Sequence, residues 1–344
     1  MHKLLKLAAG AFGVWWAAGE VLSRSVFQGK VVLITGGSRG LGLILARNFA
    51  ARGARLAICA RDPAELEAAR DELVRAGAQV LAIACDVSDA QQARIAVEQA
   101  VRAYGALDVL VNNAGIIQVA PFEEMGLLDY RQAMEINYFG MLHTTLAALP
   151  FLRRHRGRIV NVASIGGAVP VPHLLPYSAS KFAAVGFSQG LCVELRRSGV
   201  KVTTVLPGVM RTGSFVRALF KGRREREVSW FSLVSSLPVA SISAERAARR
   251  ILVACARGET HLTVGLPAKV LRLVHALVPG LNLRLLSLAN RLLPAPGGAG
   301  PAEPAEPGWL HRPLESRGPL TKLGDDASRQ NRELPWLTPA AKQT

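Results

Sequence analysis

Short apolar runs alternate with longer amphipathic stretches from residue 30 onward. The runs are rich in valine, isoleucine and leucine, which predicts buried β-strands. They read VVLIT, ARLAICA, QVLAIACD, DVLVNNAG, GRIVNVAS, VKVTTVLPG and THLTVG, beginning at residues 31, 54, 79, 108, 157, 200 and 260. Between them lie helical segments, one of which opens with Asp62 as N-cap and Pro63 in the first turn. This alternation predicts an α/β fold over residues 28–265, with a doubly wound, seven-stranded parallel sheet covered by helices on both faces.

The pattern changes after residue 265. Two leucine-rich segments, LPAKVLRLVHALV and LNLRLLSLANRLL, are separated by Pro279 and Gly280. Each carries polar side chains at spacings of three and four residues, which places them on one helical face: Lys269, Arg272 and His275, then Arg284, Ser287 and Arg291. We therefore expect C-terminal amphipathic helices, paired as a hairpin over residues 266–293. Residues 294–344 are rich in proline, glycine and charge, which predicts a largely disordered tail.

Residues 1–27 contain an apolar run from Leu7 to Gly19 after two lysines. The run is shorter than the roughly 20 residues that cross a bilayer. It can be a signal peptide, an uncleaved interfacial anchor with Trp15 and Trp16 at headgroup level, or a helix packed on its own domain. We favour a membrane anchor or interfacial helix.

The composition fits one large domain with additions, because half of the 344 residues are apolar. A formal net charge of +17 indicates an anionic partner, although a high arginine content can also reflect coding bias. We do not expect nucleic acid, because the basic residues interleave with leucines rather than with aromatic side chains. The four cysteines form no CxxC pair, so neither a metal site nor a disulfide framework is predicted, and a reducing compartment fits best.

The stretch VVLITGGSRGLG places Gly36, Gly40 and Gly42 between a predicted strand and a predicted helix. A dinucleotide site needs this context, because the glycines permit a tight turn and a close approach of the pyrophosphate to the helix N-terminus.

The spacing Thr35-Gly36-x-x-x-Gly40-x-Gly42 resembles the TGxxxGxG pattern of the short-chain dehydrogenase/reductase family. The resemblance continues through NNAG at 112–115, Asn137, Ser164, YSASK at 177–181, and PG at 207–208 with Thr212 beyond. It covers residues 28–265 and implies a single Rossmann-type domain. It also implies an NAD(P)-dependent oxidoreductase that interconverts a CH–OH group and a carbonyl.

The same resemblance assigns four catalytic residues: Asn137, Ser164, Tyr177 and Lys181. Tyr177 is the expected acid/base. Lys181 follows it by four residues on the same helical face, where its ammonium would favour the phenolate and hold the nicotinamide ribose. Ser164 would bind the substrate oxygen, and Asn137 would position a water that passes protons to Lys181.

NADP(H) is favoured over NAD(H). Cys59 and Ala60 stand where an acidic residue would select NAD, and Arg61 and Arg39 can clamp a 2′-phosphate. Asp62 would favour NAD if it faced the ribose, but we prefer it as a helix N-cap. By resemblance, Asp86 and Val87 contact the adenine. The cofactor-binding residues expected are Gly36, Ser38, Arg39, Gly40, Leu41, Gly42, Arg61, Asp86, Val87, Asn113, Ala114, Gly115, Tyr177, Lys181, Pro207, Gly208, Val209 and Thr212.

The segment 210–243 would fold over the substrate and mixes a charged patch with WFSLV, which suggests an apolar carbonyl or alcohol such as a lipid, retinoid-like or steroid-like molecule. The hairpin suits an anionic membrane surface, or else the protein's own core or a homo-oligomer interface. We expect a membrane-associated protein whose catalytic domain faces the cytoplasm, where NADP(H) is supplied. The alternative is a membrane-associated NADP(H)-binding scaffold or sensor without turnover, against which the intact Ser164, Tyr177 and Lys181 argue.

Overall fold

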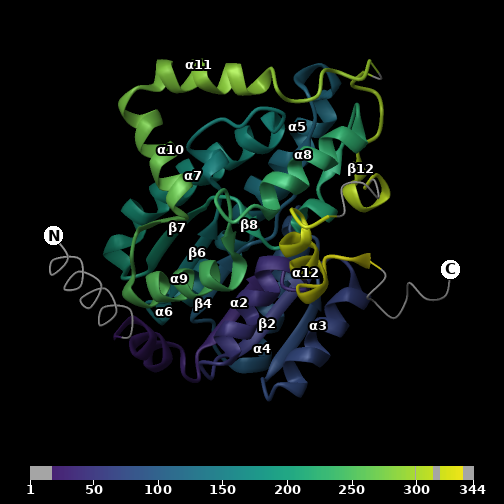
Figure 1. Ribbon diagram of the computed structural model, residues 1–344. Coiled ribbons are helices and arrows are strands. Elements are labelled where there is room, and N and C mark those ends of the chain that lie inside the picture. The colour runs from purple at the N-terminus through teal and green to yellow at the C-terminus, as the bar shows by residue number, and fades with distance from the viewer. Residues whose placement is uncertain (1–17, 299, 313–317, 336–344) are drawn as a thin grey trace, which may run out of the picture.

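A parallel sheet of seven strands runs through the centre of the computed structural model, which describes residues 18–298, 300–312 and 318–335 (Figure 1). Its order is β11-β7-β6-β4-β1-β2-β3, and all neighbours pair in parallel. The strands are β1 Val31–Thr35, β2 Arg55–Ala60, β3 Val80–Ala84, β4 Val109–Asn112, β6 Arg158–Val162, β7 Lys201–Pro207 and β11 His261–Val264. Each lies within one of the predicted runs, so the predicted fold class is confirmed.

Alternate residues of β1 pack into two separate cores. Val32 and Ile34 face one core, and Val31 and Leu33 face the other. The first core is covered by α2 Gly40–Ala50, α3 Pro63–Arg75 and α9 Ala244–Arg257. The second is covered by α4 Ala90–Tyr104, α6 Gly140–Arg154 and α7 Leu175–Glu194. Burial on both faces explains why the strands are almost continuously apolar.

The order of the strands reverses between β1 and β4. From β1 the chain proceeds to β2 and β3, and then crosses back to β4 on the other side of β1. Loops leaving the carboxyl ends of β1 and β4 therefore diverge over opposite faces and open a crevice between them. This crevice is where the glycine loop lies.

The segment 210–243, expected to fold over the substrate, is built from short elements and one helix. They are β8 Met210–Arg211, η5 Ser214–Val216, β9 Leu219–Phe220, α8 Arg224–Ser236 and β10 Ile242–Ser243. Strand β9 pairs with β5 Gln118–Val119 and with β12 Glu306–Pro307 in a small second sheet. The loop after β4 and the C-terminal region are thereby joined to this segment.

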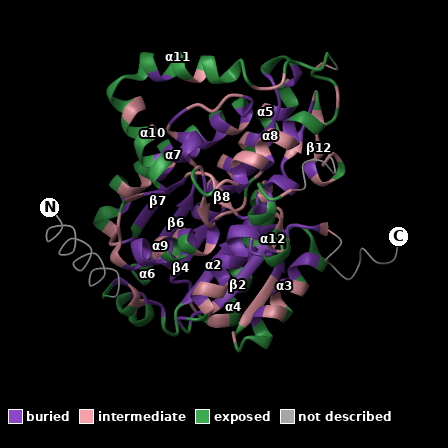
Figure 2. Cartoon of the chain, viewed as in Figure 1, coloured by how far each residue is buried: buried purple, intermediate pink, exposed green. Residues whose placement is uncertain are grey.

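The predicted hairpin forms two helices, α10 Leu266–Leu277 and α11 Pro279–Asn290, at one end of the molecule (Figure 1). Ala268, Leu271 and Leu286 pack on Ile165 and Val169 of the domain. The remaining leucines and valines are largely exposed, and α11 is exposed along most of its length (Figure 2). No helix among the described residues combines the length and apolar character needed to cross a membrane.

Only the end of the N-terminal apolar segment falls within the described residues. The chain is helical from residue 18 to 27 and packs on the domain. Phe27 is fully buried, with its ring centroid 4.9 Å from that of Phe49. Gly19 lies so close to α9 that an added Cβ would be 2.8 Å from Val253. The domain-packed interpretation therefore holds for residues 18–27, and the rest of the apolar run lies outside the described residues.

The expectation of a disordered tail is wrong for much of residues 294–344. The helix α12, Lys322–Gln330, packs beside α8 and the loop after β8. Nearer the hairpin, the buried Glu124 carboxylate accepts N–H groups of Gly297, Gly298 and Gly300 at 2.7, 2.8 and 2.7 Å. The glycines that suggested disorder let the main chain wrap around this carboxylate, so a buried charge orders a segment with few apolar residues.

The substitution Glu124→Gln should release this part of the tail. Glutamine places an amide donor against at least one of the three N–H groups, so the free energy of unfolding should fall by about 2 kcal/mol. Limited trypsin digestion should then cleave the C-terminal region faster than in the wild type. Glu123→Gln is the matched control, because Glu123 is exposed beside it. Equal digestion of both variants and the wild type would contradict the ordering role of Glu124.

Candidate functional site

The glycine loop after β1 is clamped to the loop after β4. The Thr35 hydroxyl oxygen accepts the N–H groups of Asn113 and Ala114 at 2.9 and 3.0 Å. The Asn113 amide donates in return to the carbonyl oxygens of Thr35 and Gly36 at 3.1 and 3.2 Å. The two loops at the strand-order reversal are therefore held at a fixed separation.

Two glycines of the loop are required by its geometry. Gly36 has φ +64°, and an added Cβ there would lie 3.0 Å from the Ala114 Cα. An added Cβ on Gly42 would lie 1.9 Å from the Gly36 carbonyl oxygen, a distance that no side chain can occupy. The tight turn lets the main chain reach the N-terminus of α2, where an anion is favoured.

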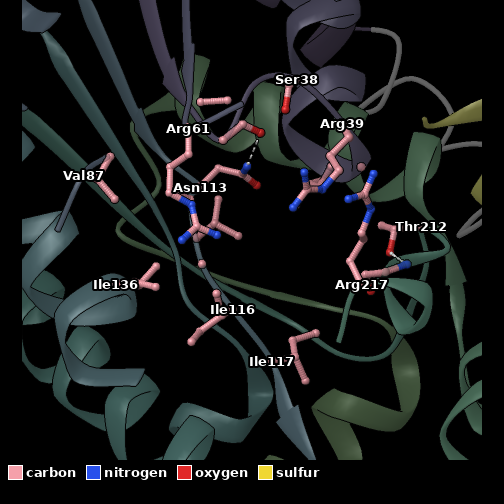
Figure 3. A pocket seen from close by; sticks show the side chains of 18 of the residues that line it. Ser38, Arg39, Arg61, Val87, Asn113, Ile116, Ile117, Ile136, Thr212 and Arg217 are labelled. Atoms are coloured by element: carbon pink, nitrogen blue, oxygen red, sulfur yellow. Dashed lines mark hydrogen bonds between the residues drawn. The ribbon is translucent and has the colours of Figure 1, made fainter. Parts of the chain in front are cut away.

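A cavity of about 760 Å³ extends from this loop to α7 (Figure 3). The volume of the cavity and its mixture of apolar and charged side chains suit a dinucleotide. Fourteen of the expected cofactor-binding residues line this cavity. They are Gly36, Ser38, Arg39, Gly40, Leu41, Arg61, Asp86, Val87, Asn113, Ala114, Gly115, Tyr177, Lys181 and Thr212. The other expected residues are not part of the lining: Gly42, Asn137, Ser164, Pro207, Gly208 and Val209.

One end of the cavity carries the arginines expected to bind a phosphate. Strand β2 ends at Ala60, and Arg61 follows it at the cavity wall. The Asp62 carboxylate accepts the Glu65 N–H at 3.0 Å and begins α3, as the capping pattern predicts. Arg39 donates to Glu65 at 2.5 Å, and its Nε lies 3.4 Å from the Glu333 carboxylate.

The other end carries Tyr177 and Lys181, one helical turn apart on α7. The Lys181 ammonium donates to the Val162 carbonyl oxygen at 3.2 Å and lies 5.7 Å from the centroid of the Tyr177 ring. The cavity wall thus holds a hydroxyl and an ammonium close together, as general acid/base chemistry at an oxygen atom requires.

Burial dominates the electrostatics of this pair. It lowers the pKa of Lys181 to about 8. It also raises the pKa of Tyr177, while a hydrogen bond with Ser164 acts in the opposite direction. The expectation that Lys181 holds the Tyr177 pKa low is therefore not met in this structure, because loss of hydration outweighs the other influences and the ammonium points to the Val162 carbonyl.

Asn137 lies in a π-helical turn, η2 Glu135–Phe139, between α5 Leu127–Met134 and α6. Its amide accepts the Ile116 N–H at 2.9 Å and donates to the Ile116 carbonyl at 3.2 Å and to Ser180 at 2.9 Å. An added Cβ on Gly115 would be 2.7 Å from Asn137 Oδ1 and 3.4 Å from Lys181 Nζ. Asn137 therefore fixes the loop after β4, and Gly115 leaves room between it and Lys181.

The remaining expected residues are held by local contacts. The Asp86 carboxylate accepts from the Ser88 hydroxyl at 2.7 Å, and the Ser164 hydroxyl accepts the Gly166 N–H at 3.0 Å. The Thr212 hydroxyl accepts the Ser214 N–H at 3.1 Å. At the end of β7, Gly208 is tied to Val264 and faces α10.

Several lining residues were missed by the sequence reasoning. They include Ile116, Ile117, Ile136, Glu65, Arg217 and Glu333. Glu65 lies in the first turn of α3, one helical turn beyond Asp62. Its place in the sequence could therefore have indicated that it lies near the end of β2 and the cavity. No sequence signal indicated Glu333, because it lies within residues 294–344, which were expected to be disordered, and almost 300 residues from the glycine loop.

Comparison with known proteins gives consistent results. A sequence model described as short chain dehydrogenase matches residues 30–220. The 11-beta-hydroxysteroid dehydrogenase A of Sesamum indicum is 37% identical over 252 residues, covering 71% of this chain and 70% of that protein. The L-fucose dehydrogenase of Bos taurus is 36% identical over 183 residues, covering 53% of this chain and 66% of that protein. The structure of L-sorbose reductase from Gluconobacter frateurii, complexed with NADPH and L-sorbose, has a TM-score of 0.62 and 25% identity, covering 69% of this chain and 95% of that chain.

The substitution Thr35→Val should destabilise the clamp between the two loops. Valine has the same shape but leaves two N–H groups without their acceptor, so the free energy of unfolding should fall by about 2 kcal/mol. Thr35→Ser keeps the hydroxyl, so its free energy of unfolding should fall by only about 0.5 kcal/mol. Urea denaturation measures both values. An equal loss in the two variants would show that the methyl group contributes as much as the hydroxyl, which contradicts the clamp.

Proposed function

Because the chain belongs to the short-chain dehydrogenase/reductase family, we propose that it is an NADP(H)-dependent oxidoreductase that interconverts a carbonyl and an alcohol by hydride transfer. One observation carries the proposal: a single cavity holds arginines at one end and the Tyr177–Lys181 pair at the other. That is the arrangement needed to bind a phosphorylated dinucleotide and to exchange a proton with a substrate oxygen.

The preference for NADP(H) rests on the end of β2. Cys59 and Ala60 close that strand, so they offer no carboxylate to the ribose at this position. Arg61 and Arg39 both reach the cavity and can bind a 2′-phosphate. The Asp62 carboxylate is engaged in capping α3, which supports its structural role over a role in selecting NAD(H).

The chain's own residues account for the proton transfer. When bound, NADP(H) supplies or takes up the hydride. In the direction of reduction, the Tyr177 hydroxyl donates its proton to the carbonyl oxygen. The Lys181 ammonium, 5.7 Å from the centroid of the Tyr177 ring, supplies a positive charge beside the phenolate although it does not lower the Tyr177 pKa in the resting site. The Ser164 hydroxyl forms a hydrogen bond with Tyr177, which supports its proposed role in binding the same substrate oxygen. In the direction of oxidation, the same groups work in reverse.

An apolar substrate is supported by the side chains around Tyr177. An apolar cluster, of which Ile117 and Tyr177 line the cavity, joins the loop after β4, the loop before α7, and the segment 210–243. Its members are Ile117, Val119, Val171, Leu174, Tyr177, Ala218, Phe220, Val228, Trp230 and Phe231. The relative from Sesamum indicum is named as a steroid dehydrogenase, which agrees with a bulky apolar substrate, whereas the sugar enzymes show how widely substrates vary on this fold.

The hairpin is proposed to bind an anionic membrane surface. Val270, Leu273 and Leu277 of α10 are 52, 59 and 72% exposed, and several leucines of α11 are exposed to a similar extent. Basic side chains accompany them on both helices, including Lys269 and Arg284, which are exposed. Apolar side chains flanked by positive charge complement an anionic lipid surface. A membrane-associated enzyme whose catalytic domain faces the cytoplasm would then take an apolar substrate from the bilayer.

The first test is a screen of carbonyl substrates that follows NADPH oxidation. Tyr177→Phe should reduce turnover at least about 100-fold, because it removes the proton donor and keeps the ring. Its affinity for NADPH should stay close to that of the wild type. In the wild type the reduction rate should fall as the pH rises above about 8, where the buried Lys181 loses its proton.

A scaffold or sensor without turnover would give a different result in the same screen. It requires NADPH binding without turnover of any carbonyl, and identical behaviour of the wild type and Tyr177→Phe. Turnover that persists unchanged in Tyr177→Phe would contradict the assigned proton donor.

Membrane binding is tested by cosedimentation with phosphatidylserine vesicles and with pure phosphatidylcholine vesicles. The wild type should prefer the anionic vesicles, and the double variant Arg284→Glu with Arg291→Glu should bind them about tenfold more weakly. Arg94→Glu is the control, because Arg94 lies on α4 at the opposite end of the molecule from the hairpin (Figure 1). No preference for anionic vesicles, together with a dimer in solution, would instead assign the hairpin to an oligomer interface.

A further inference from the structure

The C-terminal strap, residues 318–335, lies directly over the glycine loop. The Gly40 N–H, at the N-terminus of α2, donates to the Asn331 carbonyl oxygen at 2.8 Å. The Asn331 amide donates to the Thr212 carbonyl oxygen at 3.3 Å. Both Gly40 and Thr212 line the cavity, so the strap contacts the proposed cofactor site on two sides.

Glu333 extends from the strap into the wall of this cavity. Its side chain is 5% exposed, and its carboxylate lies 3.4 Å from the Arg39 Nε. An added Cβ on Gly40 would be only 2.4 Å from the Glu333 carboxylate, which shows how closely the acidic group approaches the loop. A negative charge therefore stands where the loop and Arg39 would otherwise face an anion.

Two guanidinium groups and two carboxylates lie together at this side of the cavity. Arg39 and Arg217 both donate to Glu65 of α3, at 2.5 Å each. Arg217 also donates to the Glu333 main-chain oxygen at 2.7 Å, and its guanidinium lies near that of Arg39 at one side of the cavity (Figure 3). The arginine expected to bind the phosphate thus already contacts two carboxylates.

Titration of Glu333 can change this balance near neutral pH. Burial raises the pKa of Glu333 to about 7, and Glu65 adds to the effect, whereas Arg39 and Arg217 oppose it. Above that pH the carboxylate is charged and competes for Arg39. Below it the neutral acid leaves Arg39 more available to another anion.

The carboxylate of Glu333 is not what holds the strap in place. Leu334 packs on Phe215 and Val216, and Arg332 donates to Glu72 of α3 at 2.9 Å. Ser328 of α12 is buried against Gly213. Because these anchors are independent of Glu333, an acidic side chain at this position suggests a role in ligand binding rather than in folding.

We propose that Glu333 is a specificity-determining residue that competes with the 2′-phosphate of the cofactor for Arg39. This inference rests on the proposed function and deepens it. The strap weakens binding of NADP(H) while leaving NAD(H) almost unaffected, because only NADP(H) carries a 2′-phosphate that must compete with the carboxylate of Glu333 for Arg39. The C-terminal strap thereby sets the ratio of NADP(H) to NAD(H) affinity.

The test measures dissociation constants for NADPH and NADH in the wild type, Glu333→Gln and the control Glu67→Gln. Glu67 is on the same helix as Glu65 but is exposed and pairs with Arg70. Glu333→Gln should tighten NADPH binding about tenfold and change NADH binding less than about twofold. Adenosine 2′,5′-bisphosphate should respond as NADPH does, and adenosine 5′-monophosphate as NADH does. Glu67→Gln should match the wild type for all four ligands.

A pH series separates competition from a change in fold. From pH 8 to pH 6, NADPH affinity should increase in the wild type relative to Glu333→Gln, and the variant corrects for titration of the cofactor's own phosphate near pH 6. Equal effects on NADPH and NADH, or weaker NADPH binding in Glu333→Gln, would overturn the proposal. If neither nucleotide binds the wild type, the proposed function itself fails, which is a distinct outcome.

Discussion

The rest of the site depends on the close approach of two main-chain loops at the point where the strand order reverses. The glycine loop after β1 can turn tightly only because Gly42 has no side chain, since a Cβ would meet the Gly36 carbonyl oxygen at 1.9 Å. The Thr35 hydroxyl and the Asn113 amide hold this loop against the loop after β4. The same clamp holds the loop that contains Gly115. Because Gly115 has no side chain, it leaves space between Asn137 and Lys181. One steric constraint thus positions both ends of the cavity.

Buried charges complete the site from distant parts of the chain. Glu124 gathers three N–H groups of the region after the hairpin, and Lys221 donates to Asp129 at 2.9 Å and to the Pro301 carbonyl oxygen at 2.9 Å. Glu333 is then carried to Arg39 by the strap. Glu124 and Lys221 are buried, and a buried charge must have partners, so the region after the hairpin becomes ordered although it has little apolar surface to bury.

The sequence predicted the seven strands and the glycine loop, because strand burial and local turn geometry depend on neighbouring residues. The Asp62 cap was predictable for the same reason. Tyr177 and Lys181 were expected from the family resemblance, and both line the cavity. The C-terminal strap was not predictable, because its order comes from contacts with residues more than a hundred positions away, such as Arg217 with Glu333. The pKa of Tyr177 was expected to be low from its spacing to Lys181, yet it depends on burial, which residue spacing does not show.

The most direct test of the account is an equilibrium titration of the wild type and Arg61→Ala with NADPH and NADH. NADPH should bind the wild type with micromolar affinity and bind Arg61→Ala at least about tenfold more weakly, whereas the affinity for NADH should be almost the same in the two proteins. Such a result would identify the glycine loop and its arginines as the cofactor's phosphate site. Failure of both nucleotides to bind the wild type would contradict it.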